Sequence, residues 1–202
     1  MSNIKHLKKI KFVKLPKDML NIFFITNILF FFPFNTTKAQ DLESDLILAK
    51  DNISVGKLDE AKLILENILK KDPSYAPAYV AFSKFWLLKA NIGKASESAS
   101  FAVRIDEEFR PWWDELNNIK EKIQIGTSNV KKQNYNAAEE IFSGLIQQYP
   151  SYPEMYYYLG VAKYKQKNFK ESIGYFDKAL DLFPGYLKAQ KASLNAKKRT
   201  KK

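Results

Sequence analysis

The side chains that most often carry out catalysis or bind metals are scarce in this sequence. Cysteine is absent, and the single histidine is His6, close to the N-terminus. A catalytic triad needs a base such as histidine, a thiol nucleophile needs cysteine, and ordinary zinc sites are built from the same two residue types. Aspartate and glutamate are present, but no close pair lies in an apolar setting that would raise a pKa. The sequence therefore predicts no catalytic, cofactor-binding or metal-binding residues, and it predicts that the protein is not an enzyme.

Aromatic side chains are a more distinctive feature, above all in the stretch PEMYYYLGVAKY, residues 153–164. Tyrosine is well suited to binding, because it offers a large contact area at a low conformational cost. Successive residues of a helix are rotated by about 100°, so the three adjacent tyrosines cannot all face the same neighbour. The elements around them must decide which tyrosine lies in a core and which faces a partner.

A pattern recurs around these tyrosines at a constant offset in residue number, which we call the period. Segments 132–152 and 166–186 align at that offset and pair similar residues: Gly126/Gly160 just before them, then Tyr135/Phe169, Ala138/Ser172, Phe142/Phe176, Pro150/Pro184 and Tyr152/Tyr186. Segments 55–75 and 90–109 carry weaker copies. Each copy has two stretches of helical spacing joined at Asn or Gly, and proline closes most of them. Small residues at one shared position (Ala61, Ala95, Ala138, Ser172) would let the two helices of a copy approach closely.

These copies resemble tetratricopeptide repeats (TPRs), which carry Leu-Gly, aromatic residues, alanines and proline at set offsets. The copy at 153–186 matches with Tyr156, Leu159, Gly160, Phe169, Phe176, Ala179 and Pro184, and departs at Lys163 and Ser172. The resemblance implies an all-α fold, an α-solenoid of about four TPR helix-turn-helix repeats plus a C-terminal capping helix. One hairpin cannot bury its apolar face alone, so neighbouring hairpins must stack.

The period divides the chain into segments. We expect repeats one and two within 40–109, a helical insertion at 110–118, repeats three and four within 119–186, and a basic capping helix and tail at 187–202. Pro111 suits a first helical turn, and the apolar residues after it continue into repeat three, so the first helix of that repeat should be longer by about two turns. Trp112 and Trp113 either seal the junction between repeats two and three or form an exposed anchor.

The resemblance also implies a concave groove that binds a protein or peptide. In the family pattern Tyr156 packs inside its repeat, whereas Tyr157 and Tyr158 face the groove or pack against the preceding repeat. The predicted groove comprises Leu46, Lys50, Val80, Lys84, Leu87, Lys120, Ile123, Thr127, Lys131, Tyr157, Tyr158, Val161, Tyr164 and Lys165. Such a mixture suits an extended peptide or a partner helix. One family subset clamps acidic C-terminal peptides with Lys, Asn and Arg, but Ala81 stands where that clamp needs Asn, so we expect no chaperone tail.

The N-terminal segment, 1–39, is typical of an export signal. A Lys-rich start precedes the apolar run Met19–Phe34, and Thr37 and Ala39 occupy the −3 and −1 positions of a cleavage site. The apolar run is shorter than the roughly 20 residues that a membrane-spanning helix needs. Together with the Asn-, Ile-, Lys- and Phe-rich composition, this favours a bacterial scaffold exported to the periplasm. The alternative is an adaptor anchored to the inner membrane by the same segment, if it is retained.

The net charge of +11 is concentrated at the two ends. Residues 1–18 carry six lysines and residues 187–202 carry seven Lys or Arg and no acid, whereas residues 42–186 hold 19 bases and 20 acids. A neutral body without a nucleic-acid motif predicts no nucleic-acid partner. The basic tail is either solvated or meets anionic lipid or an acidic protein. The sequence leaves self-association open.

Overall fold

The computed structural model describes residues 33–201. The chain forms two units, Met1–Glu43 and Ser44–Lys202. Of the first unit only residues 33–43 are described, and they form the beginning of helix α2 (Pro33–Ser54). The predicted export signal, including most of the Met19–Phe34 run, lies outside the described residues and stays a prediction. Among the helices that are described, none combines the length and the apolar character needed to cross a membrane.

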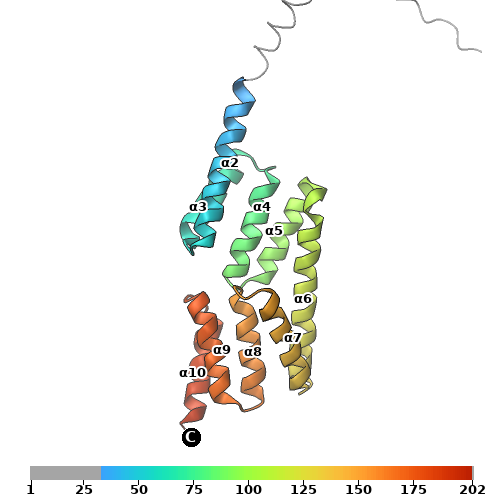
Figure 1. The fold of residues 1–202 in the computed structure, drawn as a ribbon, viewed down its shortest axis with the longest axis vertical. Coiled ribbons are helices and arrows are strands. Elements are labelled where there is room, and N and C mark those ends of the chain that lie inside the picture. Colours follow the sequence, from blue (N-terminus) through green and yellow to red (C-terminus); the bar gives the residue numbers. More distant parts are fainter. Residues whose placement is uncertain (1–32, 202) are drawn as a thin grey trace, which may run out of the picture. The chain divides into compact units, whose positions relative to one another are not determined.

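The second unit is a succession of helical hairpins (Figure 1). The end of α2 is followed by α3 (Leu58–Lys71), α4 (Ala76–Leu88), α5 (Ile92–Ile105), the short 3-10 helix η1 (Glu107–Phe109), α6 (Arg110–Lys131), α7 (Tyr135–Gln148), α8 (Pro153–Lys165), α9 (Phe169–Leu182) and α10 (Leu187–Thr200). From α3 to α10 each α-helix packs against the next one along the chain. We number the hairpins along the chain as α2–α3 (hairpin one), α4–α5 (two), α6–α7 (three) and α8–α9 (four). No strand occurs within residues 33–201. The predicted all-α solenoid of helix-turn-helix repeats is confirmed.

The period of the sequence is visible in the backbone of the turns. Gly56 and Ala90, with φ of 78° and 53°, lie one period apart in the turns that follow α2 and α4. Gln133 and Lys167, with φ of 64° and 65°, lie one period apart in the turns that follow α6 and α8. A left-handed residue of this kind ends a helix and redirects the chain. Ala90 and Gln133 are separated by more than one period, so the additional residues of the chain fall between these two turns.

Small residues bring the two helices of each hairpin together. The side chains at the four positions that the repeat pattern marked as small, Ala61, Ala95, Ala138 and Ser172, are completely buried. Glycine allows a still closer approach: a Cβ atom added to Gly160 would lie only 2.6 Å from Cε1 of Phe176. The aromatic ring on α9 can therefore rest on the backbone of α8 only because that position has no side chain.

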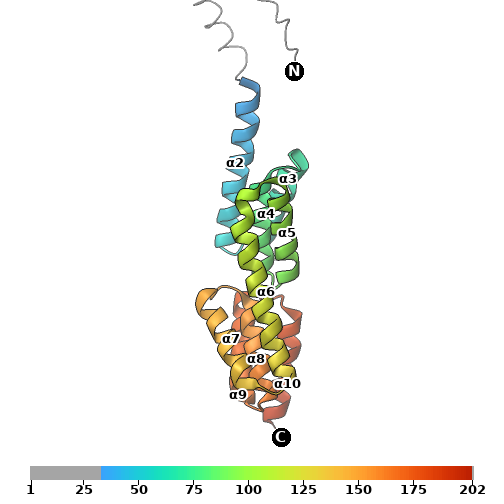
Figure 2. The same ribbon diagram turned by 90° about the vertical axis from the view of Figure 1, so that its right-hand side faces the viewer.

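Helix α6 is the longest element of the second unit, with 22 residues against 13 in α8. It runs beside α5 at its start and beside α7 and α8 at its end (Figures 1 and 2). Leu116, Ile119 and Ile123 on α6 are buried in one hydrophobic core that also takes residues from α4, α5, α7 and α8. As the apolar series predicted, the helix is extended, and it joins the hairpins on either side of it.

The two adjacent tryptophans pack at the start of α6. Both are partly buried against the shared core. The indole Nε1 of Trp112 donates a hydrogen bond to Oγ of Ser83 on α4 at 2.5 Å, and Lys84 lies over the same ring. The guanidinium of Arg110 lies over the ring of Trp113. Of the two roles that the sequence left open, the structure supports the sealing of the junction between hairpins two and three.

Hairpins two and four also meet, although they are not neighbours along the chain. The backbone N–H of Ile92, at the start of α5, donates a hydrogen bond to Oε2 of Glu154 on α8 at 3.1 Å. The ammonium of Lys89 lies 4.8 Å from the ring centre of Phe183 in the turn between α9 and α10. The turn between α4 and α5 is thus seated against the fourth hairpin, which no feature of the repeat pattern predicted.

Candidate partner-binding surface

Three of the predicted groove residues belong to the core instead. Leu46, Leu87 and Ile123 are exposed by only 1%, 2% and 5%. Leu87 and Ile123 lie in the core that α4, α5, α6, α7 and α8 share, because α6 presses against the hairpins on both sides. These three side chains cannot offer a surface to a partner in this conformation, which corrects that part of the predicted groove.

Tyr158 is held by the preceding hairpin, the alternative that the sequence gave beside the groove. Its ring stacks on Phe142 of α7 with the ring centres 5.5 Å apart. Its hydroxyl donates a hydrogen bond to Oε1 of Glu154 at 3.3 Å. Burial and the neighbouring carboxylate raise the pKa of this hydroxyl above its ordinary value, so Tyr158 stays neutral and acts as a packing residue.

The other two adjacent tyrosines are also partly buried. Tyr157 contacts the rings of Phe176 and Tyr186, at centre distances of 6.0 Å and 5.3 Å. Tyr156, which was predicted to pack inside its repeat, belongs to the same region and donates its hydroxyl hydrogen to the carbonyl oxygen of Pro150 at 3.1 Å. Tyr158 therefore packs on the preceding hairpin, whereas Tyr156 and Tyr157 share one cluster around Tyr186, and none of the three is fully exposed.

The other predicted groove residues remain accessible. Val80, Thr127, Val161 and Tyr164 are partly exposed, and so in part or in full are Lys50, Lys84, Lys120, Lys131 and Lys165. Those on α6 and α8 lie on two neighbouring helices, and they occupy matching positions one period apart: Thr127/Val161 and Lys131/Lys165. We call Thr127, Lys131, Val161, Tyr164 and Lys165 the α6–α8 surface. Whether it binds a partner stays a prediction at this point.

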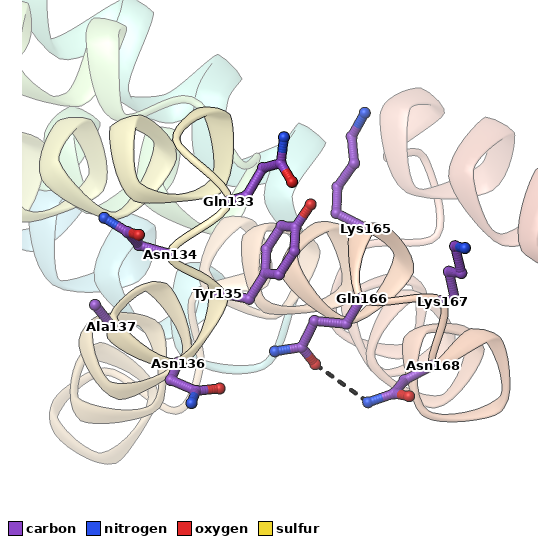
Figure 3. Close-up of a pocket in the computed structure, with 9 residues that line it drawn as sticks. All are labelled: Gln133, Asn134, Tyr135, Asn136, Ala137, Lys165, Gln166, Lys167 and Asn168. Atoms are coloured by element: carbon purple, nitrogen blue, oxygen red, sulfur yellow. Dashed lines mark hydrogen bonds between the residues drawn. The ribbon is translucent and has the colours of Figure 1, made fainter.

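A hollow of about 940 Å³ lies beside this surface, between the turn that follows α6 and the turn that follows α8. It is lined by Gln133, Asn134, Tyr135, Asn136, Ala137, Lys165, Gln166, Lys167 and Asn168. Figure 3 shows the side chains of Gln133, Tyr135 and Lys165 projecting to the same side of the two turns. Nδ2 of Asn168 donates a hydrogen bond to Oε1 of Gln166 at 3.1 Å (Figure 3). We call this hollow the amide pocket.

The side chains that line the amide pocket are mostly polar. Side-chain amides both donate and accept hydrogen bonds, and so they can pair with the main chain of a peptide. The ammonium groups of Lys165 and Lys167 add positive charge that suits a carboxylate. Lys165 belongs both to the pocket and to the α6–α8 surface, so the two form one continuous candidate site.

The residues of the amide pocket other than Lys165 were not in the predicted groove. Their signal in the sequence is the recurrence of KQNYN at 132–136 and QKNFK at 166–170, one period apart. In the sequence this recurrence indicates only a helix boundary. It places both turns at the ends of first helices, but the distance between the turns depends on how the hairpins stack.

A second hollow, of about 680 Å³, lies where hairpins one, two and four come together. It is lined by Ile53, Ser54, Gly56, Lys57, Leu58, Asp59, Glu60, Leu88, Lys89, Ser151, Leu182, Phe183, Pro184 and Gly185. The ammonium of Lys89 lies 3.8 Å from Oδ1 of Asp59 and also lies over the ring of Phe183. The ammonium group of Lys89 is therefore already paired within the fold. We interpret this hollow as a junction between hairpins.

Glu154 is a buried carboxylate, with an exposed fraction of 5%. Burial raises its pKa above the ordinary value of 4.5, and the hydrogen bond from the backbone N–H of Ile92 opposes that rise. Both carboxylate oxygens are occupied, one by Ile92 and the other by Tyr158. Glu154 therefore connects hairpins two and four. Within residues 33–201, no three metal-ligating carboxylates or imidazoles gather into a site for an ion.

The comparisons with known proteins agree with the repeat geometry. Residues 123–186, from the middle of α6 through α9, match the family model described as "tetratricopeptide repeat". This match covers most of hairpins three and four. The amide pocket lies between the internal turns of these two hairpins, and the α6–α8 surface is formed by their first helices. A comparison of the sequence with curated proteins found no match.

Several solved structures align with most of the chain. MamA (AMB-1) is 18% identical, with a TM-score of 0.37, and the alignment covers 80% of this chain and 84% of MamA. YrrB, titled a TPR protein with an unusual peptide-binding site, is 21% identical, with a TM-score of 0.36 and coverage of 80% and 97%. PilF of Pseudomonas aeruginosa is 18% identical, with a TM-score of 0.38 and coverage of 82% and 71%.

Proposed function

We propose that the chain is a non-catalytic adaptor that binds a protein or peptide partner along the α6–α8 surface, with part of the partner in the amide pocket. The observation that carries this proposal is the amide pocket, which is continuous with the accessible α6–α8 surface because Lys165 belongs to both. Val161 and Tyr164 supply apolar contact area, and the turns supply hydrogen-bonding groups. The lack of cysteine, and of histidine beyond His6, supports a role without catalysis.

The chemistry of the site favours an extended segment that carries at least one acidic residue. Lys131 and Lys165 are exposed cations on the two first helices, and neither has an ion pair within the described residues. An acidic side chain of the partner would meet them without displacing a contact of the fold. The amides of the pocket would pair with the main chain of the same segment.

The place of action that we propose is the periplasm, after export and cleavage near Gln40. The support is the composition of residues 1–39, since that segment lies largely outside the described residues. The second candidate is a membrane-tethered adaptor that keeps the Met19–Phe34 segment. N-terminal sequencing of the protein purified from its cell separates the two: a start near Gln40 rejects the tether, and an intact N-terminus rejects cleavage.

The binding proposal is tested by reversing charge at the site. The double variant Lys131→Glu, Lys165→Glu removes both cations, and Lys170→Glu, Lys178→Glu makes the same change on α9. Each protein is used as bait in quantitative pull-downs from the source cell. We expect at least one partner that the wild type and the α9 variant retain and that the site variant loses. If both variants retain the same partners as the wild type, the site is wrongly assigned.

A further inference from the structure

Helix α10 occupies the position that the first helix of a fifth repeat would take. Leu187 begins α10 one period after Pro153 begins α8. The buried residues Ala189, Ser193 and Ala196 of α10 match Met155, Leu159 and Ala162, which are buried on α8. One side of α10 is also tied to α9, because Oγ of Ser193 and Nζ of Lys197 both donate to Asp177. This side of α10 therefore repeats the packing of α8 on the hairpin before it.

The other side of α10 is uncovered within the described residues. In α8 the matching side is covered by α9: Tyr157 and Gly160 lie against Phe176, and Tyr164 lies against Phe169. The residues one period later on α10 are Lys191, Leu194 and Lys198, and all three are exposed. Leu194 is exposed by 55% and Leu187 by 65%. The α10 face, meaning Leu187, Lys191, Leu194 and Lys198, thus has the register of a surface that a second helix would cover.

The charge on this face indicates the kind of helix. Residues 187–202 hold seven Lys or Arg and no acid. Some of these cations are engaged within the fold, since Lys197 pairs with Asp177 and Arg199 lies over the ring of Phe169. Lys191 and Lys198 have no ion pair within residues 33–201, and they flank Leu194 on the same side of the helix, three and four positions away.

We propose that the α10 face binds an amphipathic, acidic helix of a partner protein, which lies beside α10 as the second helix of a hairpin. Apolar side chains of that helix cover Leu187 and Leu194, and its carboxylates pair with Lys191 and Lys198. This is recognition of a helix by a helical surface. The site is separate from the α6–α8 surface, so either can fail without the other.

A protein helix fits this face better than an anionic membrane. A helix that lies in the membrane interface presents a broad apolar side to the lipid. The α10 face has two leucines separated by a lysine, and the small apolar residues Ala189 and Ala196 of α10 are buried against the preceding hairpin. Leu194 lies one period after Gly160, which α9 covers in the fourth hairpin. Packing of a second helix explains this position, whereas attraction to lipid would not require a leucine there.

The chain itself supplies a probe, because α9 covers the matching side of α8. The probe is a fluorescent peptide of residues 168–183 with three changes, Lys170→Glu, Lys178→Glu and Phe176→Ala. The first two make it acidic, and the third makes room for Leu194 at the position where Gly160 lies against Phe176. Binding to the full chain is measured by fluorescence anisotropy at low and high salt, together with a control peptide that keeps both lysines.

We expect the full chain to bind the acidic peptide more tightly than the control peptide, and salt to weaken the binding. Leu194→Glu and the double variant Lys191→Glu, Lys198→Glu should each weaken it by about tenfold or more, which corresponds to about 1.4 kcal/mol. Leu63→Glu changes a leucine of similar exposure, 61%, on α3 and should leave the binding unchanged. Circular dichroism checks that every variant keeps its helical content.

Three outcomes would overturn the proposal. The first is that the acidic peptide does not bind, and the second is that Leu194→Glu and Leu63→Glu weaken its binding equally. The third is Leu194-dependent binding to phosphatidylglycerol-containing vesicles without binding of the peptide, which would assign the face to a membrane surface.

Discussion

At the scale of single residues, the spacing between the two helices of hairpins three and four depends on a glycine in the first helix. A Cβ atom at Gly126 would lie 2.6 Å from Cζ of Phe142, and one at Gly160 would lie equally close to Phe176. The corresponding first-helix residues of hairpins one and two are Ala49 and Ser83, both completely buried. Glycine is therefore needed in hairpins three and four, where the second helix places a phenylalanine ring against this position of the first helix.

This close approach predicts opposite effects for two glycine substitutions. In Gly160→Ala the new methyl group meets the ring of Phe176, so α8 and α9 must move apart, and we expect a loss of about 1–3 kcal/mol in the free energy of unfolding. Gly174→Ala lies on the same hairpin with nothing within 4 Å of the added Cβ, and it should gain about 0.5–1 kcal/mol through helix propensity. Urea denaturation measures both. Equal effects of the two changes would show that the contact does not limit the packing.

Glu154 makes stability depend on pH in a direction opposite to that of a salt-bridged carboxylate. Burial raises its pKa in the folded state above 4.5, so folding favours the protonated form. The contribution of Glu154 to stability is full below the unfolded pKa and is lost as the pH rises through the folded pKa. Glu154→Gln stays neutral and can still accept the hydrogen bond from Ile92.

We therefore expect the stability of the wild type relative to Glu154→Gln to fall as the pH rises from 4.5 through the raised pKa, and then to level off. Urea denaturation of both proteins at several pH values measures this difference. A difference that stays constant, or one that increases with pH, would mean that burial does not raise the pKa of Glu154 in the folded protein.

The three adjacent tyrosines show what a sequence can predict about single residues. Helical rotation required that they not all face one neighbour, and Tyr158 indeed stacks on Phe142 of α7 while Tyr156 and Tyr157 lie beside the cluster around Tyr186. The pattern could not tell whether Tyr157 would be free for a partner, because that depends on the rings of Phe176 and Tyr186. Phe176 lies on the second helix of the same hairpin and Tyr186 lies just before α10, and only the packing of α9 and α10 against α8 brings the two rings to Tyr157.

At the scale of elements, α6 is the helix that joins the first part of the stack to the last. The sequence predicted its extension from an apolar series at helical spacing, and the structure has a helix of 22 residues there. The pattern also predicted the helical hairpins and their period, because small residues, glycines and prolines recur at fixed offsets. The contacts between hairpins two and four could not be predicted, because a repeating pattern relates each hairpin only to the next one along the chain.

The junction at the start of α6 predicts different roles for the two tryptophans. Trp112→Phe removes the indole N–H that bonds to Ser83 on α4, so we expect a loss of about 1 kcal/mol in the free energy of unfolding. Trp113→Phe removes no hydrogen bond that the structure shows and should cost less. Thermal and urea denaturation compare the two variants. A larger effect of Trp113→Phe would show that Trp113, and not the hydrogen bond of Trp112, contributes most to the stability of this junction.

At the scale of the whole second unit, hairpins two to four form one connected body. One hydrophobic core takes residues from α4 to α8, and the turn between α4 and α5 is also seated against α8 and the turn between α9 and α10. The positions of the α6–α8 surface, the amide pocket and the α10 face all depend on this stacking. A simple succession of neighbouring hairpins would leave Lys89 and Phe183 apart.

A cross-link between hairpins two and four therefore gives the sharpest test of this stacking. The chain has no cysteine of its own, so the double variant Lys89→Cys, Phe183→Cys can be treated with a short thiol-to-thiol cross-linker, with each single variant as a control. Mass spectrometry of the digested monomer then identifies the linked peptides. We predict an efficient intramolecular cross-link in the double variant under native conditions, lost in urea. A folded, helical double variant that gives no intramolecular cross-link would refute the stacking of hairpin two on hairpin four.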